Sequence, residues 1–290
     1  MTWLFYAITM TVLAASAAII EKKSLFKIHA MQFSSVLAIV NMLVGLPFLV
    51  VADYSSLNIS VVVLMFFASI IGALAFLLVA KSLRHIDISI SAPLLALSPA
   101  LTALLGFLLL GELLTLVQII GILLIVIGSY FVTFKKGDNF FKGITNFVRF
   151  KYYRFILFAV CLYSFGSILD KYFLTTYNLE AVTYVAIMQV FIAFHLFILI
   201  SVFHRGIKDI KEGFSKAKWL ILLISAFTVG YRFAQAEALK QVQTGIVIAF
   251  KRMSVLLVVL IGGELFHEKH LVKKVLASII MILGVLLIVL

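Results

Sequence analysis

Ten stretches of about twenty residues, nearly free of charged side chains, occupy most of this 290-residue chain and constrain its fold more than any other feature. A helix of roughly 20 apolar residues spans the 30 Å hydrocarbon core of a bilayer. The stretches cover residues 1–20, 30–52, 60–80, 88–111, 113–134, 155–174, 182–203, 218–240, 244–266 and 271–290. The sequence therefore predicts an all-α integral membrane protein with ten transmembrane helices.

The composition excludes most other classes of protein. Hydrophobic residues make up 64% of the chain and charged residues 12%, about half the charged share of a soluble domain. We therefore expect no binding to nucleic acid, despite the net charge of +12. The first stretch, Met1–Ile20, lacks the basic start and cleavage site of a signal peptide, so we expect it to be the first span.

The second half of the chain resembles the first. At an offset of 156 residues, Gly106 aligns with Gly262 and Glu112 with Glu268. Each half holds five spans, an odd number, so the second copy must insert upside down relative to the first. Such inverted repeats are typical of secondary transporters. We therefore expect two inverted five-helix repeats.

The loops predict the domain boundaries and the orientation. We expect one repeat over residues 1–134, a basic cytoplasmic connector at 135–154 and the second repeat over 155–290. Of the 24 lysines and arginines, 19 lie in loops on the connector's side, against two on the other side. The positive-inside rule therefore predicts a plasma (inner) membrane protein with both termini outside the cytoplasm.

Three cations lie inside the predicted spans. Arg232 and Arg252 each fall about 4–5 Å to the same side of the membrane centre, with Lys251 one step further along. A lipid-facing cation at that depth costs roughly 2.5–3.5 kcal/mol, so these side chains should face the bundle interior. Tyr231 and Gln235 can share the helix face of Arg232. The five residues form a candidate anion-binding site; the alternatives are an internal salt-bridge cluster or side chains that extend to the headgroups.

Two acid–lysine pairs occupy equivalent places in the repeats. Glu21 precedes Lys22 in the first repeat, and Asp170 precedes Lys171 in the second. These pairs are candidates for gates that break and form during transport, and Asp170 could also carry a proton. The alternative is a helix-end ion pair that contributes little.

The helix that covers 88–111 contains Pro93 and Pro99, and each proline removes a backbone hydrogen bond. We therefore expect that helix to bend toward a central cavity. Glu112 and Glu268 follow the ends of the two equivalent helices, and we expect them to turn the chain and cap helix ends.

Glycines mark a close helix contact. Gly121 and Gly128 in the fifth span, with Gly284 in the tenth, would let two helix backbones approach. The contact could lie within one chain or between two, and the second case would make the protein a homodimer.

The sequence contains no recognisable enzymatic motif. His267, Glu268 and His270 lack the i, i+4 histidine spacing of a zinc protease helix, and there is no glycine-rich phosphate loop or serine elbow. We therefore expect no enzyme, no metal and no cofactor.

The stretch SLRHIDISISAPLLALSPALTALLGFLLLGE and its shorter echo in the second half resemble the drug/metabolite transporter superfamily, EamA type, over essentially the whole chain. The stretch IAFKRMSVLLVVLI is also similar to the corresponding helix of triose-phosphate/phosphate translocators, where a Lys-Arg pair holds the substrate phosphate. The resemblance implies that role for Lys251 and Arg252. Members of the family usually place both termini in the cytoplasm, the reverse of what the lysine count predicts here.

These observations predict a secondary transporter of a small organic metabolite, anionic or phosphate-bearing, that works by alternating access with exchange or proton coupling. Its partners would be that small molecule and membrane lipid. One alternative is an exporter of amino acids or drugs whose intramembrane cations are structurally paired. Another is a lipid-phosphate flippase or a membrane scaffold.

Overall fold

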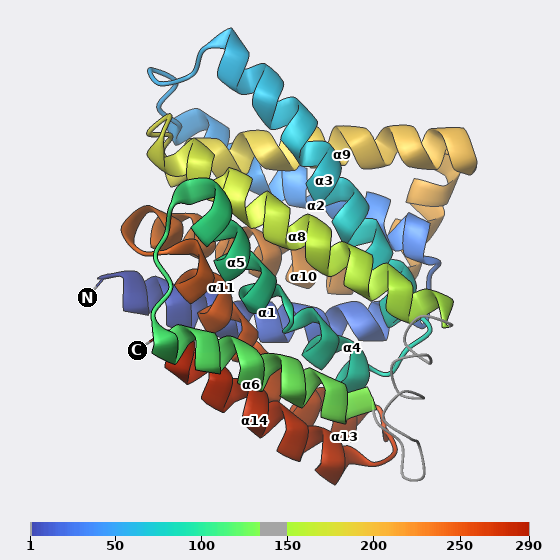
Figure 1. Ribbon diagram of the computed structural model, residues 1–290. Coiled ribbons are helices and arrows are strands. Elements are labelled where there is room, and N and C mark those ends of the chain that lie inside the picture. The colour runs from blue at the N-terminus through green and yellow to red at the C-terminus, as the bar shows by residue number, and fades with distance from the viewer. Residues whose placement is uncertain (1, 134–149, 290) are drawn as a thin grey trace.

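The computed structural model describes residues 2–133 and 150–289, and every regular element within them is a helix (Figure 1). The first half contains α1 (Thr2–Leu25), α2 (Ala30–Val51), α3 (Ile59–Leu83), α4 (Ile88–Leu95), α5 (Ser98–Leu110) and α6 (Leu116–Thr133). The second half contains α8 (Lys151–Thr175), α9 (Ala181–Phe203), α10 (Ile207–Gln241), α11 (Thr244–Arg252), α12 (Ser254–Leu257), the π-helical turn η1 (Val258–Gly262), α13 (Gly263–Leu265) and α14 (Leu271–Val289). Most of the predicted connector at 135–154 lies outside the described residues.

The predicted all-α membrane fold is confirmed. Within the described ranges, nine helices or helix pairs are long and apolar enough to cross a membrane, and α6 contributes the shorter apolar helix Leu116–Gly128. The main difference from the predicted spans concerns α10, which begins at Ile207 and bends at Lys218, where the span was predicted to start. The bend separates a polar amphipathic segment from the apolar helix that follows.

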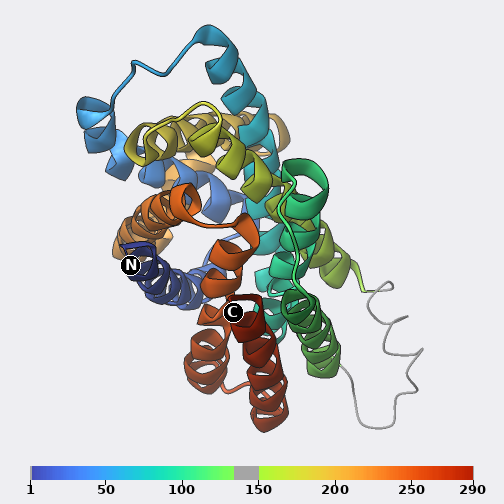
Figure 2. The ribbon, with the colours of Figure 1, turned by 60° about the vertical axis from the view of Figure 1, so that its left-hand side comes forward.

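Helices from opposite halves lie side by side throughout the bundle. The helix α1 packs along α10, and its counterpart in the second half, α8, packs along the counterpart of α10, which is α3. The pairs α2–α9 and α6–α14 join equivalent helices (Figure 2). This reciprocal pairing supports the expected repeat, whose inverted relationship stays a prediction. Both termini lie at the same end of the bundle, as an even number of spans requires.

The α6–α14 contact is closed by glycines of the same chain. A Cβ atom added to Gly284 would lie 2.5 Å from the carbonyl oxygen of Gly121, and one added to Gly128 would lie 2.4 Å from the Met281 side chain. The close contact predicted for these glycines therefore lies within one chain.

Replacing Gly284 by alanine is expected to destabilise the protein by about 1–3 kcal/mol, because the added methyl group meets backbone atoms that cannot rotate away. The measurement is the thermal unfolding midpoint in detergent. Gly45→Ala serves as the control, because nothing lies within 4 Å of a Cβ at that helical position. That change should leave the midpoint unchanged or raise it. Equal losses in both variants would contradict the packing argument.

Two glutamates cap helices of the opposite half. The carboxylate of Glu112 accepts hydrogen bonds from the backbone N–H and the hydroxyl of Thr244, at 3.1 and 3.0 Å, at the start of α11. In the equivalent arrangement, Glu268 accepts the backbone N–H of Ile88 at 2.6 Å and of Ser89 at 3.0 Å, at the start of α4, together with the Ser89 hydroxyl. A carboxylate at a helix N-terminus satisfies unpaired N–H groups and favours the helix dipole. The capping role predicted for both glutamates is confirmed, and each cap joins the two halves.

Within the described part of the chain, an ion pair network is found at the Glu268 cap and not at the Glu112 cap. Lys274 lies 3.4 Å from Glu268 and 3.1 Å from Asp87. In the other half of the chain, the position equivalent to Lys274 is Gln118, and the position equivalent to Asp87 is Gln243. Both glutamines are uncharged. The two ends of the bundle are therefore held by equivalent caps of different charge.

Replacing Glu268 by glutamine is expected to lower the free energy of unfolding by about 1.5–3 kcal/mol, because hydrogen bonds to a charged acceptor are lost from α4 and Lys274 loses one partner. Thermal unfolding measures the effect. The matched control is Glu264→Gln, since Glu264 is exposed on α13 one turn earlier. A midpoint for Glu268→Gln that equals the control's would rule out a stabilising cap.

Candidate functional site

Two spans are broken at the same place in the two halves. In the first half α4 ends at Leu95 and α5 begins at Ser98; in the second α11 ends at Arg252 and α12 begins at Ser254, 156 residues after Ser98. The bend predicted from the prolines of the first half is therefore present. At the equivalent position, Met253, the helical hydrogen-bond pattern is interrupted while the backbone stays in the right-handed helical region, with φ of −59° and ψ of −24°. This interruption has no proline, and the sequence analysis did not predict it. Broken helices inside a membrane protein are tolerated where they line a cavity.

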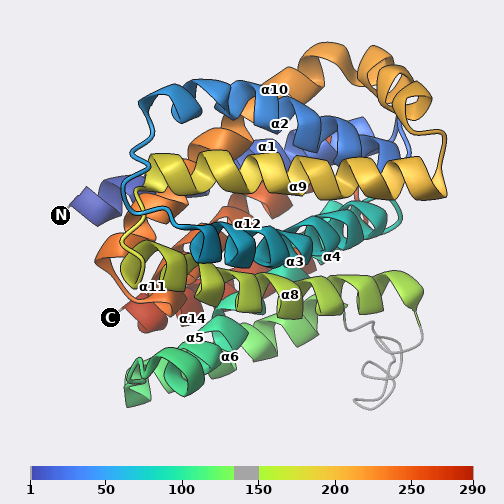
Figure 3. The same cartoon turned by 90° about the horizontal axis from the view of Figure 1, so that it is seen from above.

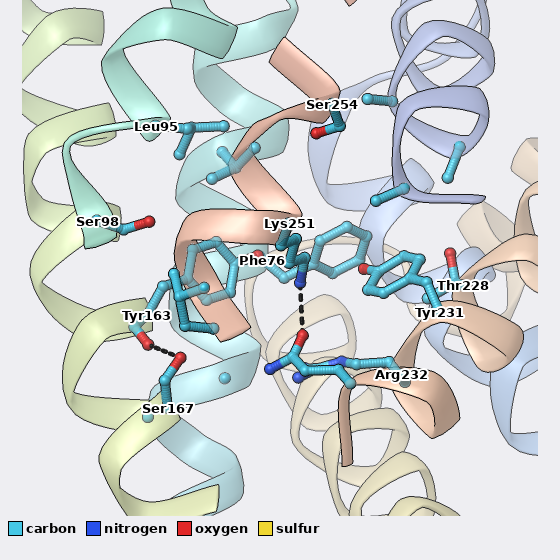
Figure 4. Close-up of a pocket in the computed structure, with 18 of the residues that line it drawn as sticks. Phe76, Leu95, Ser98, Tyr163, Ser167, Thr228, Tyr231, Arg232, Lys251 and Ser254 are labelled. Atoms are coloured by element: carbon cyan, nitrogen blue, oxygen red, sulfur yellow. Dashed lines mark hydrogen bonds between the residues drawn. The ribbon is translucent and has the colours of Figure 1, made fainter. Parts of the chain in front are cut away.

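A cavity of about 170 Å³ lies between the two breaks. Residues from both halves line it, contributed by α1, α2, α3, α4, α5, α8, α9, α10, α11, α12 and η1. Figure 4 shows its wall, with Ser98 and Tyr163 on one side and Tyr231 and Arg232 on the other. Movement of one half against the other would therefore change the side of the membrane to which the cavity is open.

All five residues predicted to bind an anion line this cavity. The Lys251 ammonium donates a hydrogen bond of 2.8 Å to the amide oxygen of Gln235, drawn as a dashed line in Figure 4. It also lies 4.5 Å from the centre of the Tyr231 ring, in a cation–π contact. The partners of Lys251 are thus neutral.

Arg252 connects one helix break to the other. Its Nε donates a hydrogen bond of 2.9 Å to the hydroxyl of Ser98, the first residue of α5. The carbonyl of Ser98 in turn accepts the hydroxyl of Ser164 on α8 at 3.2 Å. Among the residues that the structure describes, no carboxylate lies within 4 Å of Lys251 or Arg252.

Arg232 differs from the other two cations because it has an acidic partner. Its Nη1 lies 3.7 Å from one carboxylate oxygen of Asp170, and the Tyr184 hydroxyl donates a hydrogen bond to the other. A second cavity, of about 20 Å³, is lined by these three residues, and both Asp170 and Arg232 also line the larger one. The salt-bridge alternative raised by the sequence therefore describes Arg232 and does not describe Lys251 or Arg252.

The charges that line the cavity do not balance. Three cations line it, together with the two acids Glu21 and Asp170. Glu21 interacts electrostatically with Lys251 but lies beyond the 4 Å of an ion pair. With every group ionised, the lining carries one excess positive charge in a low-dielectric setting, where electrostatic interactions are strong.

The two lysines of the predicted gates, Lys22 and Lys171, donate hydrogen bonds to backbone carbonyl groups. Each ammonium donates two hydrogen bonds to carbonyls at and just beyond the end of a helix, α3 in one half and α10 in the other. Lys22 bonds Leu83 O at 2.5 Å and Ile86 O at 2.7 Å, and Lys171 bonds Leu239 O at 2.6 Å and Val242 O at 2.8 Å. The matching contacts repeat the equivalence of the halves. A gating role for these lysines stays a prediction, and their neighbours Glu21 and Asp170 are the members of each pair that reach the cavity.

Sequence reasoning missed several polar residues of the site, among them Ser98 and Tyr184. Ser98 could have been suspected because it precedes Pro99 in the bent span. Tyr184, which bonds Asp170, carried no signal, because a tyrosine near a helix start is common in membrane proteins. Across the described parts of the chain, no group of three His, Cys, Asp or Glu side chains is placed to hold a metal ion.

Comparison with known proteins gives one family and a shared fold. The sequence pattern of the EamA-like transporter family matches residues 1–134 and 150–290. A solved structure titled "Crystal structure of protein" superposes with a TM-score of 0.70 at 13% sequence identity, over 98% of this chain and 94% of the other. At that identity the likeness concerns the fold alone. No curated protein matches the chain.

Proposed function

This chain belongs to the EamA-like transporter family, and from that premise we propose that it is a secondary transporter of a small organic anion, carboxylated or phosphorylated. Membership makes it an integral membrane transporter of small solutes. The anion would bind in the central cavity, and the two halves would rock around it to expose the site alternately to each side.

The observation that supports an anionic solute is the state of Lys251 and Arg252. Both cations line the cavity next to a helix break, and their hydrogen-bond partners are an amide and a hydroxyl. A buried cation without a counter-charge is costly unless a ligand supplies that charge. The planar guanidinium of Arg252 can bind a carboxylate or phosphate through two hydrogen bonds, while Lys251 acts as a point charge.

Asp170 gives the site a means of coupling to protons. In this structure its carboxylate forms an ion pair with Arg232. Protonation of Asp170 would neutralise it and leave Arg232 available to the anion, so that proton and anion would bind together. The charged or titratable groups around Asp170 are Arg232, Tyr184 and, farther away, Lys251. Proton-coupled uptake is accordingly the form of transport that this site favours.

The rival function is export of amino acids or drugs. The Arg232–Asp170 ion pair favours it, because a structurally paired cation is not free to bind an anion. The two functions differ in their ligands: an anion site prefers phosphorylated and carboxylated solutes, whereas the rival site prefers zwitterionic, neutral or cationic ones.

A thermal-shift screen of the purified protein tests the proposal, since ligands that bind the folded state raise its unfolding midpoint. The panel would contain inorganic phosphate, triose phosphates, dicarboxylates, neutral amino acids and cationic drugs at equal ionic strength. We expect shifts from phosphorylated or carboxylated solutes only, followed by their exchange in proteoliposomes. Shifts confined to neutral amino acids or cationic drugs would replace the proposal by the rival.

A further inference from the structure

The segment of α10 before its bend has no part in the cavity. It covers residues 207–217 and ends at Lys218, whose φ of 32° and ψ of −111° interrupt the helix. Figure 3 shows this first part of α10 set at an angle to the remainder. The positive φ at a lysine is a strained conformation that is uncommon outside glycine. A strained bend at the point where the apolar span begins places the segment at the membrane boundary.

The inner face of the segment is fixed to the bundle. Asp209 is 3% exposed and accepts hydrogen bonds from Gln32 of α2 at 3.2 Å and from Arg205. Gly213 allows close approach, since a Cβ there would lie 3.1 Å from Val36 of α2. The segment therefore has a defined outer face.

That outer face combines large apolar side chains with basic ones. Ile207 and Phe214 are 59% and 40% exposed, and Trp219, just after the bend, is 64% exposed. The lysines at positions 208, 211 and 218 are exposed as well. A face of this composition is typical of helices that lie in the headgroup region of a bilayer.

These three lysines are available for an external partner. Nearby acids are already engaged: Asp209 pairs with Arg205, and Glu212 pairs with Arg205 and Lys216 at 2.6 Å each. Within the described ranges, no carboxylate lies within 4 Å of Lys208, Lys211 or Lys218. The face thus carries unneutralised positive charge beside side chains suited to acyl chains.

We infer that this face, formed by Ile207, Lys208, Lys211, Phe214, Lys218 and Trp219, binds the headgroups of anionic phospholipids in the leaflet at that end of the bundle. The lysines attract the acidic headgroups, each contributing roughly 1 kcal/mol near a charged surface, while Phe214 and Trp219 enter the acyl boundary. The basic loops of the same end suit an anionic leaflet. The inference is independent of the transported solute.

Trp219 offers a direct test, because the chain has only two tryptophans. Trp3→Phe leaves Trp219 as the sole indole and keeps the ring contact of residue 3 with Phe250. The protein is placed in vesicles of phosphatidylcholine and phosphatidylglycerol at 7:3, with bromine labels either on the phosphatidylglycerol or on an equal amount of phosphatidylcholine. Because bromine quenches an indole on contact, we expect quenching by the labelled phosphatidylglycerol to be at least about threefold stronger.

The triple variant Lys208→Gln, Lys211→Gln and Lys218→Gln should reduce that ratio to about one, and 0.5 M salt should reduce it in the unsubstituted lysine background through screening. The matched control, Lys23→Gln, Lys27→Gln and Lys269→Gln, removes the same charge from exposed positions at the same end and should keep the ratio. A ratio near one before any lysine is changed would overturn the inference. So would a ratio that survives the triple variant and high salt, or one that the control abolishes equally.

Discussion

Replacing Arg252 by glutamine is expected to reduce uptake of the anionic solute by about 30-fold to 1,000-fold while making the empty protein more stable. The loss follows because removing one partner of a desolvated charge pair costs binding free energy, here about 2–4 kcal/mol. The gain follows because, among the residues that the structure describes, Arg252 has a hydroxyl but no carboxylate within hydrogen-bond reach. It also lies in a cavity with two other cations. Removing its charge relieves desolvation and repulsion, an effect of about 0.5–2 kcal/mol. Proteoliposome uptake and the unfolding midpoint of the empty protein measure the two changes.

Two controls separate charge from structure in that experiment. Ser98→Ala removes the hydroxyl that bonds Arg252 but keeps the cation, so uptake should fall far less than in Arg252→Gln. Arg154→Gln removes an exposed arginine in the first turn of α8, at the end of the bundle, and should leave uptake unchanged. If Arg252→Gln instead lowers the unfolding midpoint together with uptake, the guanidinium is a structural group, and the exporter alternative gains.

Much of the fold could be predicted from the sequence because lipid imposes a strict rule. Each span must satisfy its own backbone hydrogen bonds, so charge-free stretches of sufficient length become helices. For this reason the predicted boundaries fall within a few residues of α2, α3, α9 and α14. The first part of α10 was missed because its lysines and acids resemble a loop, although its buried Asp209 fixes it to α2 as a helix.

The site could be predicted in part, by the cost of burying charge. That cost brought Arg232, Lys251 and Arg252 to the bundle interior and into one cavity. Which cation is paired could not be predicted, because the partners come from distant parts of the chain. Asp170 lies 62 residues before Arg232, and Ser98 lies 154 residues before Arg252. The interruption at Met253 could not be predicted from a local signal, because that segment contains no proline. It was recognisable only as the position equivalent to the break in the first half.

Replacing Asp170 by asparagine is expected to uncouple transport from the proton gradient while leaving solute exchange intact. Asparagine keeps the shape and can still accept the Tyr184 hydroxyl, but it leaves Arg232 without the carboxylate at 3.7 Å. In the parent protein, Asp170 must be protonated before Arg232 is free to bind the anion. Because protonation increases as the pH falls, solute affinity should rise as the pH falls. In the variant the affinity should be high at every pH, roughly 5- to 150-fold above that of the parent at alkaline pH.

The decisive comparison is between gradient-driven uptake and exchange at equal pH. Asp170→Asn should lose gradient-driven uptake and keep exchange at equal pH. Arg232→Gln should weaken solute binding and remove the pH dependence of that binding. Glu180→Gln, at an exposed carboxylate before α9 on the same end of the bundle, is the matched control and should behave as the parent. Retention of proton-driven accumulation by Asp170→Asn would assign coupling to another group. A loss of both activities together with the fold would instead make the Asp170–Arg232 pair structural, because breaking a buried ion pair leaves an uncompensated charge worth about 3–5 kcal/mol.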